Sequence, residues 1–283
     1  MARTNEEMID IERPTAICVA PNGGRLTKAD HPSLPLGPAD LARTAKECLD
    51  AGACLIHVHV RDQDGQHVLD ATAYRDVIDA IGRAVGNEMI VQVTSEALGR
   101  YAPQEQIAVI KDTRPEAVSL ALREFVPTEA HETEFASFLS WLQAEQIFPQ
   151  IILYDADETL RLDEYHSRGL IPWNQLPVLF VLGRYTVGQR SSPADLMPFL
   201  DGSKPRFAHW SVCAFGAREA ACVTTAALLG GHVRVGFENN RQLADGAIAK
   251  SNGELVAGVS KSLLGLGLHS ASAADLRHAW QEL

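Results

Sequence analysis

Short apolar runs rich in β-branched residues alternate with longer amphipathic stretches along the whole chain. A buried strand and an amphipathic helix repeat their apolar positions with different periods, so the two kinds of element can be told apart. The pattern predicts about eight strands, at Thr15–Ala20, Leu55–Arg61, Met89–Ser95, Ala117–Leu122, Gln150–Asp155, Val178–Gly183, Phe207–Ala214 and His232–Asn239.

The stretches between these runs have helical spacing. Proline at position 38 suits a first helical turn, and the apolar residues that follow recur at Leu41, Ala45, Cys48 and Leu49. Ser251 and Glu254 predict a capping box at the start of the last helix. Repeated βα units of about 30 residues favour an α/β fold, a single-domain (β/α)8 TIM barrel over residues 15–283. A doubly wound sheet is less favoured, because no GxGxxG turn follows the first strand.

Composition narrows the possible partners. The chain has 283 residues, 46% of them hydrophobic, which allows a large core. A net charge of −11 without any basic run argues against nucleic acid or an anionic membrane as a partner, so a small molecule is expected. Five cysteines form no CxxC pair, which is typical of a reduced, cytoplasmic protein. Residues 1–14 are polar and acidic and predict a flexible N-terminal segment, and no apolar run approaches the ~18 residues of a membrane span.

Two histidines stand one residue apart in the second predicted strand, Leu55-Ile-His-Val-His-Val-Arg61. Alternate side chains of a strand share a face, so His57 and His59 point the same way. A single buried histidine is most often a hydrogen-bonded core residue, whereas a shared metal ion satisfies two imidazoles at once. The pair therefore predicts two ligands of a metal site that needs a third.

The last predicted strand supplies a candidate third ligand. Alternation along it turns Arg234 and Glu238 toward the barrel interior, and Glu238 lies at the carboxyl end, where TIM barrels carry their active sites. His57, His59 and Glu238 then form a His2Glu site with an open coordination position. The alternative is an inward salt bridge between Glu238 and Arg234 or Arg61.

Four segments resemble the β-keto acid cleavage enzyme family, nearly from end to end of the chain. They are Ala29-Asp-His-Pro-Ser-Leu-Pro35, Ala51-Gly-Ala-Cys-Leu-Ile-His-Val-His-Val-Arg-Asp62 with Asp64-Gly65, Gly230-Gly-His-Val-Arg-Val-Gly-Phe-Glu238, and Ser251-Asn252 before Leu255-Val256. The resemblance implies a TIM barrel that holds zinc or another divalent metal on His57, His59 and Glu238. It also implies conversion of a β-keto acid and acetyl-CoA into acetoacetate and a new acyl-CoA, and a homo-oligomer, either a dimer or a tetramer.

The residue types suit this chemistry. A β-keto acid can chelate a metal through its ketone and carboxylate oxygens, and the ion's charge stabilises the enolate formed when the intervening carbon loses a proton. That carbon attacks the thioester, and a retro-Claisen cleavage follows, so no enzyme nucleophile is required. In the family an arginine–aspartate pair assists the proton transfer. The arginine matches Arg234, but Asn239 replaces the aspartate, and an amide cannot accept a proton at neutral pH.

Three more positions match substrate-binding residues of the family. Asn22 stands where the characterised member has a glutamate that faces the substrate's amino group, whereas Thr94 and Ser119 keep the hydroxyl function. The alternatives are a turn at Asn22 and ordinary strand-end hydrogen bonds at the other two. Bulkier charged residues replace the family's glycines at Glu96-Ala97, Arg123 and Arg184-Tyr-Thr-Val-Gly188. These changes predict a different acyl group, for which a second carboxylate is one candidate, unless the side chains pair with one another.

Two other functions stay open on the sequence. One is a metal hydrolase of the amidohydrolase type, which would carry its His-x-His on the first strand and further histidines on the fifth and sixth. The other is a barrel that binds metal and keto acid without turnover, which Asn239 motivates.

Overall fold

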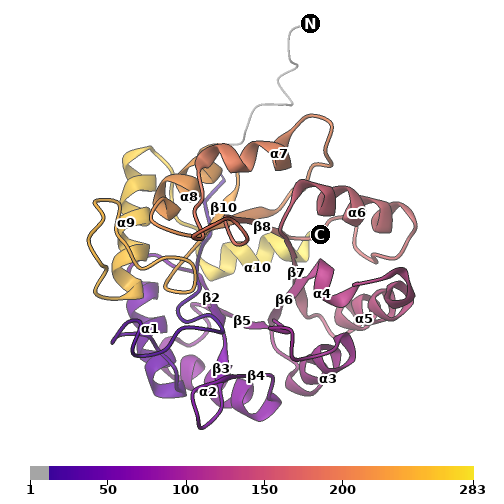
Figure 1. Cartoon of the computed structure of the whole chain (residues 1–283), viewed down its shortest axis with the longest axis horizontal. Helices are drawn as coiled ribbons and strands as arrows, with labels where there is room; N and C mark the ends of the chain where they lie inside the picture. Colours follow the sequence, from indigo (N-terminus) through magenta and orange to yellow (C-terminus); the bar gives the residue numbers. More distant parts are fainter. Residues whose placement is uncertain (1–12) are drawn as a thin grey trace, which may run out of the picture.

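The computed structural model describes residues 13–283 and confirms the predicted TIM barrel (Figure 1). Within these residues, eight parallel strands close in the order β1-β10-β9-β8-β7-β6-β5-β2. The strands are β1 (Ile17–Val19), β2 (Leu55–Val58), β5 (Ile90–Thr94), β6 (Ala117–Ala121), β7 (Phe148–Leu153), β8 (Val178–Leu182), β9 (Trp210–Ala214) and β10 (His232–Val235). Each overlaps one of the eight predicted strands.

Helices surround the barrel (Figure 1). They are α1 (Pro38–Asp50), α2 (Ala71–Val85), α3 (Pro103–Thr113), α4 (Leu122–Phe125), α5 (Glu132–Ala144), α6 (Ala156–Ser167), α7 (Met197–Leu200), α8 (Glu219–Leu228), α9 (Asn252–Gly265) and α10 (Ala273–Gln281). Proline occupies the first turn of α1, as predicted. Residues 1–12, which make up most of the predicted flexible segment 1–14, lie outside the described residues.

Three predicted details are wrong. The strand Leu55–Arg61 breaks at His59, and β3 (Val60–Arg61) leaves the barrel to pair antiparallel with β4 (His67–Val68). The helix that Ser251 opens, α9, is followed by α10 and so is not the last. Only half of its predicted capping box forms, because the Glu254 carboxylate accepts from the backbone N–H of Lys250 instead of that of Ser251.

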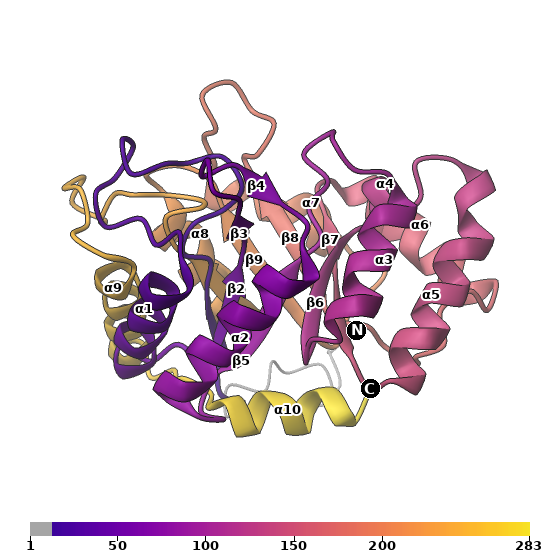
Figure 2. The same cartoon turned by 90° about the horizontal axis from the view of Figure 1, so that it is seen from below.

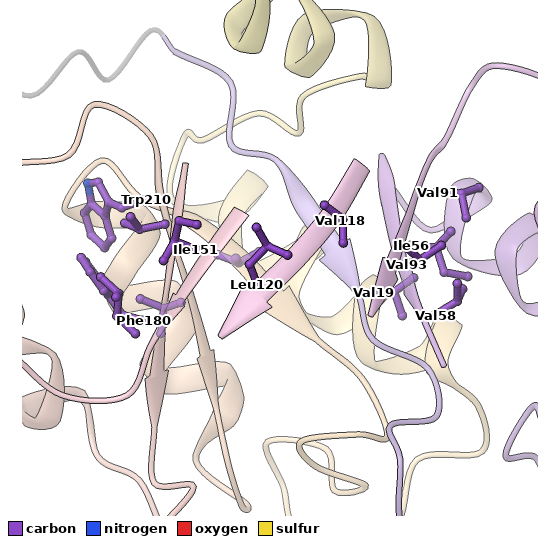
Figure 3. Close-up of a cluster of buried hydrophobic side chains, with 14 of the residues drawn as sticks. Val19, Ile56, Val58, Val91, Val93, Val118, Leu120, Ile151, Phe180 and Trp210 are labelled. Carbon is purple, nitrogen blue, oxygen red and sulfur yellow. The ribbon is translucent and has the colours of Figure 1, made fainter. Parts of the chain in front are cut away.

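The strands separate an outer apolar layer from an inner polar one. Outward-facing side chains pack against the helices and include Val19, Ile56, Val58, Val91, Val93, Val118, Leu120, Ile151 and Phe180 (Figure 3). The residues between them, His57, Gln92, Thr94 and Ser119, are buried and polar. Because strands alternate their side chains, these polar groups share the barrel interior. The outer layer supplies the hydrophobic stabilisation, and the inner layer is left for chemistry.

Helix α10 covers the end of the barrel at which the strands begin (Figure 2). Leu276 and Trp280 of this helix belong to one buried cluster with Leu55, Ile90 and Ala117. The opposite end, where the strands finish, carries loops and the short β3–β4 sheet (Figure 2). The fold therefore leaves the carboxyl ends of the strands open to ligands.

Near the covered end, the buried His232 is expected to lower the free energy of unfolding in acid. Its Nδ1 accepts from Ala16 N–H at 3.0 Å. Burial, with Arg13 and His209 nearby, lowers its pKa from 6.5 to about 3. The unfolded chain therefore binds this proton at a higher pH than the folded chain does, so the stabilisation is complete above pH 6.5 and declines as the pH falls toward 3. At pH 5 we expect a loss of about 2 kcal/mol from this group.

Urea unfolding of the wild type and of His232→Asn at pH 8 and pH 5 tests this prediction. The asparagine oxygen can replace the acceptor for Ala16 but does not titrate. The variant is expected to lose less stability than the wild type between the two pH values. Parallel losses in both proteins would contradict the assignment.

Candidate active site

A cavity of about 200 Å³ opens at the carboxyl ends of the strands. Its walls come from β2, β5, β6, β7, β8, β9 and β10 and from the residues that follow β1, β2, β5, β7, β8, β9 and β10. Among the residues that line it are the predicted site residues His57, His59, Glu238, Arg234, Asn22, Thr94 and Ser119. Seven of the eight site residues chosen from the sequence thus border one cavity, and the exception is Asn239.

His57, His59 and Glu238 form a compact group of three donors. The two Nε2 atoms lie 3.2 Å apart, and Glu238 Oε2 lies 3.7 Å from His57 Nε2 and 3.3 Å from His59 Nε2. Ligands about 2.1 Å from a tetrahedral zinc ion stand about 3.4 Å from one another. Glu238 Oε2 is buried and has no hydrogen-bond partner. The donor set and its spacing therefore fit a divalent ion.

A sharp turn after β10 brings Glu238 into this group. Gly236 has a φ of +139°, and a Cβ at that position would lie 2.3 Å from the carbonyl oxygen of Ala20, so only glycine fits. The backbone N–H of Glu238 then donates to the same carbonyl at 3.1 Å. Asn252, from the matched Ser251-Asn252 segment, accepts from Phe237 N–H at 2.9 Å and holds the other side of the turn.

Arg234 and Glu238 form an ion pair beside the two histidines. The salt bridge considered as an alternative to a metal site is therefore present together with the three-donor group. Burial by itself would raise the pKa of Glu238, but Arg234 and the two histidines outweigh it and hold that pKa well below 4.5. Burial alone would lower the pKa of Arg234, but Glu238, helped by Cys213, Cys18 and Tyr154, outweighs it and raises that pKa. Arg234 thus remains a cation, and its Nε and Nη1 atoms are buried without partners.

The sequence reasoning missed Gln92, which orients His57. Its Oε1 accepts from His57 Nδ1 at 2.9 Å, and its Nε2 donates to Gln150 Oε1 at 3.2 Å. Gln150 in turn donates to Ser211 Oγ at 3.3 Å. This buried chain places the proton of His57 on Nδ1, so the lone pair of Nε2 faces His59 and Glu238. A glutamine inside the β-branched run Ile90-Val-Gln-Val-Thr94, on the same face as Thr94, was the available signal.

Breaking this chain is expected to weaken metal binding. For Gln92→Leu we expect metal affinity to fall by roughly 10- to 100-fold, the usual cost of losing the hydrogen bond that orients a histidine ligand. Gln92→Glu keeps an acceptor for His57 and is expected to retain more affinity. Competition with a chromophoric chelator measures both, and an affinity of Gln92→Leu equal to that of the wild type would contradict the role.

The three predicted substrate-binding residues differ in what they still offer. The side-chain amide of Asn22 is bonded to the backbone. It donates to the carbonyls of Pro35 and His59 at 3.0 and 2.9 Å and accepts from His59 N–H at 3.3 Å. These bonds replace strand pairing at His59 and fix this residue. Thr94 Oγ1 accepts from Glu96 N–H at 3.0 Å, whereas Ser119 Oγ is buried without a partner. Ser119 therefore has the most hydrogen-bonding capacity left for a substrate.

Asn239 does not line the cavity. Both polar atoms of its side chain are buried without a hydrogen-bond partner, so it makes no hydrogen bond to Arg234. The carboxylates that do line the cavity are Glu238 and Glu96. Glu96 lies with Oε2 at 3.8 Å from His59 Nδ1, and its Oε1 accepts from Arg25 at 2.9 Å.

The charged residues predicted at the rim divide into two groups. Glu96 and Arg184 line the cavity as predicted. Arg123 does not line it, because its guanidinium pairs with Asp155 and Glu158 and lies 4.6 Å from the ring centre of Tyr154. Arg123 therefore pairs with neighbouring side chains, the alternative to a role at the cavity rim.

Fold and site together define a TIM barrel with a His2Glu group at the mouth of a substrate-sized cavity. The apo structure of ObcA resembles it with a TM-score of 0.69 and 16% identity, over 88% of this chain and 66% of that chain, and this likeness shows the fold alone. The profile of the β-keto acid cleavage enzymes matches residues 14–281. The chain belongs to this family.

Two relatives illustrate the range of the family. The 3-keto-5-aminohexanoate cleavage enzyme of Fusobacterium nucleatum is 32% identical over 277 residues, which cover 93% of this chain and 94% of the relative. The 3-oxoadipate:acetyl-CoA acetyltransferase of Cupriavidus necator is 26% identical over 275 residues, which cover 94% of each. The amidohydrolase alternative gains no support, because the histidine pair starts on β2 and neither β7 nor β8 contains a histidine.

Proposed function

We propose that this protein exchanges acyl groups between a β-keto acid and acetyl-CoA, with a divalent ion, zinc by preference, on His57, His59 and Glu238. The observation that carries the proposal is the buried three-donor group at the edge of a substrate-sized cavity. Family membership supports the same reaction. The proposed co-substrate is acetyl-CoA, and the products are acetoacetate and an acyl-CoA.

The reaction balances without an oxidant or an enzyme nucleophile. The carbon between ketone and carboxylate loses a proton and attacks the acetyl thioester, which releases CoA. The thiolate then attacks the original ketone carbon, the bond between that carbon and the nucleophilic carbon breaks, and a proton returns to acetoacetate. The ion, when bound, supplies positive charge that stabilises the negative charge developing on the keto acid's oxygens.

The side chains of the protein would divide the remaining work. Arg234 keeps Glu238 ionised and offers its unpartnered N–H groups to anionic oxygens. Ser119 would hold the substrate through its free hydroxyl, and Thr94 would fix the loop at Glu96. We assign the proton transfer to Glu96, because it is the cavity carboxylate that does not belong to the three-donor group.

The test is an assay of the zinc-loaded protein with acetyl-CoA and a panel of β-keto acids, scored for acetoacetate. Acetoacetate that requires both substrates and disappears after chelation supports the proposal. Binding of keto acid without acetoacetate from any panel member would favour the alternative of a barrel without turnover.

The proposed partners are small molecules. We propose that the chain assembles as a homo-oligomer, either a dimer or a tetramer, and that it acts in the cytoplasm. Light scattering of the purified protein tests the assembly. Among the described residues, no helix combines the length and the apolar character needed to cross a membrane.

A further inference from the structure

The half of the cavity that faces the metal group is apolar. Strand β8 lies across the barrel from β2 in the strand order. The wall there consists of side chains from β7, β8 and β9 and the residue after β9, namely Ile152, Leu179, Val181, Cys213 and Phe215. These side chains pack on one another in a cluster separate from the outer core. An aliphatic portion of a substrate would be desolvated against this wall.

One cation, Arg184, sits at the end of this wall with unused hydrogen-bond donors. It follows β8, lines the cavity and stacks 5.0 Å from the ring centre of Phe215. Its side chain is only 16% exposed, yet its guanidinium donates no hydrogen bond to any residue from 13 to 283. The nearest carboxylate, Glu96, is 3.8 Å away, too far for a hydrogen bond, and is already bonded to Arg25 at 2.9 Å.

A guanidinium has five N–H groups and is costly to desolvate without acceptors. The aromatic face beneath Arg184 fixes its plane but accepts none of these hydrogens in the usual geometry. A planar guanidinium that is stacked on an aromatic ring and still has its donors open to a substrate cavity is suited to a carboxylate, which it can bind through two parallel hydrogen bonds.

We propose that the acyl group of the substrate is a short aliphatic chain that ends in a second carboxylate, and that Arg184 binds this carboxylate. The substrate class is therefore the β-keto dicarboxylates. This inference rests on the proposed function and adds the identity of the acyl group. The aliphatic carbons would lie along Leu179, Val181 and Phe215, and the keto acid end would lie at the three-donor group.

Charge balance at the rim agrees with this assignment. Arg25 and Arg184 supply two positive charges and Glu96 one negative charge, which leaves one positive charge for an anionic substrate end. A substrate with a terminal ammonium group would add to that excess, and Asn22, whose amide is fully bonded, offers it no carboxylate.

The test uses three six-carbon β-keto acids with acetyl-CoA: 3-oxoadipate, 3-oxohexanoate and 3-keto-5-aminohexanoate. We expect kcat/KM for 3-oxoadipate to exceed that for 3-oxohexanoate by roughly 10- to 100-fold, the effect of one charge-assisted pair. The kcat/KM for 3-keto-5-aminohexanoate is expected to be the lowest of the three. Arg184→Leu is expected to abolish the ratio, and Arg184→Lys to retain part of it. Arg190→Leu, which removes the same charge from the same loop outside the cavity lining, is the matched control and should keep the ratio.

Calorimetric titration of 3-oxoadipate into each protein without acetyl-CoA gives a readout that does not depend on turnover. Weaker binding to Arg184→Leu than to Arg190→Leu supports the inference even if no acid yields acetoacetate, a result that would remove the proposed function instead. Equal kcat/KM for 3-oxoadipate and 3-oxohexanoate would overturn the inference and leave the proposed function intact. A rise in the KM of acetyl-CoA without a change in the substrate ratio in Arg184→Leu would also overturn it, because the arginine would then serve the CoA.

Discussion

His57→Ala and His59→Ala are each expected to lose the divalent ion and at least about a hundredfold of activity, while the barrel stays folded. Removal of a ligand should cost more than removal of a residue that only orients one, for which losses of about 10- to 100-fold are usual. The donors that remain, one imidazole and Glu238, are too few to hold the ion firmly. Without the ion, the negative charge that develops on the keto acid's oxygens is no longer stabilised.

Elemental analysis after dialysis against a weak chelator, alongside circular dichroism, measures the two parts of this prediction. The matched control is His232→Asn, which replaces the buried histidine that begins β10, near Leu276 and Trp280 of α10. It should keep the wild-type metal content. If both His57→Ala and His59→Ala kept that content too, the three-donor group would not be a metal site.

Much of the fold and of the three-donor group could be predicted from the sequence because both follow from strand parity. The alternation in Ile56-His-Val-His59 turns the two imidazoles inward whatever the neighbouring strands are. The inward position of Glu238 was predicted from strand alternation continued as far as Asn239, which is not how the residue reaches the site. The strand ends at Val235, and the glutamate reaches the site through the turn at Gly236, which hydrophobic periodicity does not reveal.

The roles of individual polar side chains could not be predicted in the same way, because their partners come from distant elements. Asn22 is bonded to Pro35 and His59, and Gln92 to Gln150, contacts that depend on how loops and neighbouring strands meet. The sequence predicted that Glu96 would either face the cavity or pair with an arginine. Glu96 does both, since Arg25 bonds to one of its oxygens and the other oxygen lies near His59.

Two substitutions distinguish Glu96 from position 239 as the source of the catalytic base. We expect Glu96→Gln to lower kcat by about 10²- to 10⁴-fold, the usual contribution of a general base, without a change in metal content. The amide keeps an acceptor for Arg25 but cannot take a proton. Asn239→Asp is expected to be neutral or harmful, because it puts a second negative charge on the residue next to Glu238, in a buried position with no hydrogen-bond partner.

Deuterium exchange at C2 of the keto acid, measured without acetyl-CoA, isolates the proton transfer from the later steps. Exchange should slow in Glu96→Gln and stay near the wild-type rate in Arg25→Leu, which removes the ion pair but leaves the carboxylate. If Arg25→Leu slowed exchange as much as Glu96→Gln, the pair would be structural. Faster exchange in Asn239→Asp, with Glu96→Gln unaffected, would instead identify position 239 as the deficient member of an arginine pair. The carboxylate that the family places next to the metal-binding glutamate would then be what this chain lacks, and Glu96 would serve only to neutralise the rim.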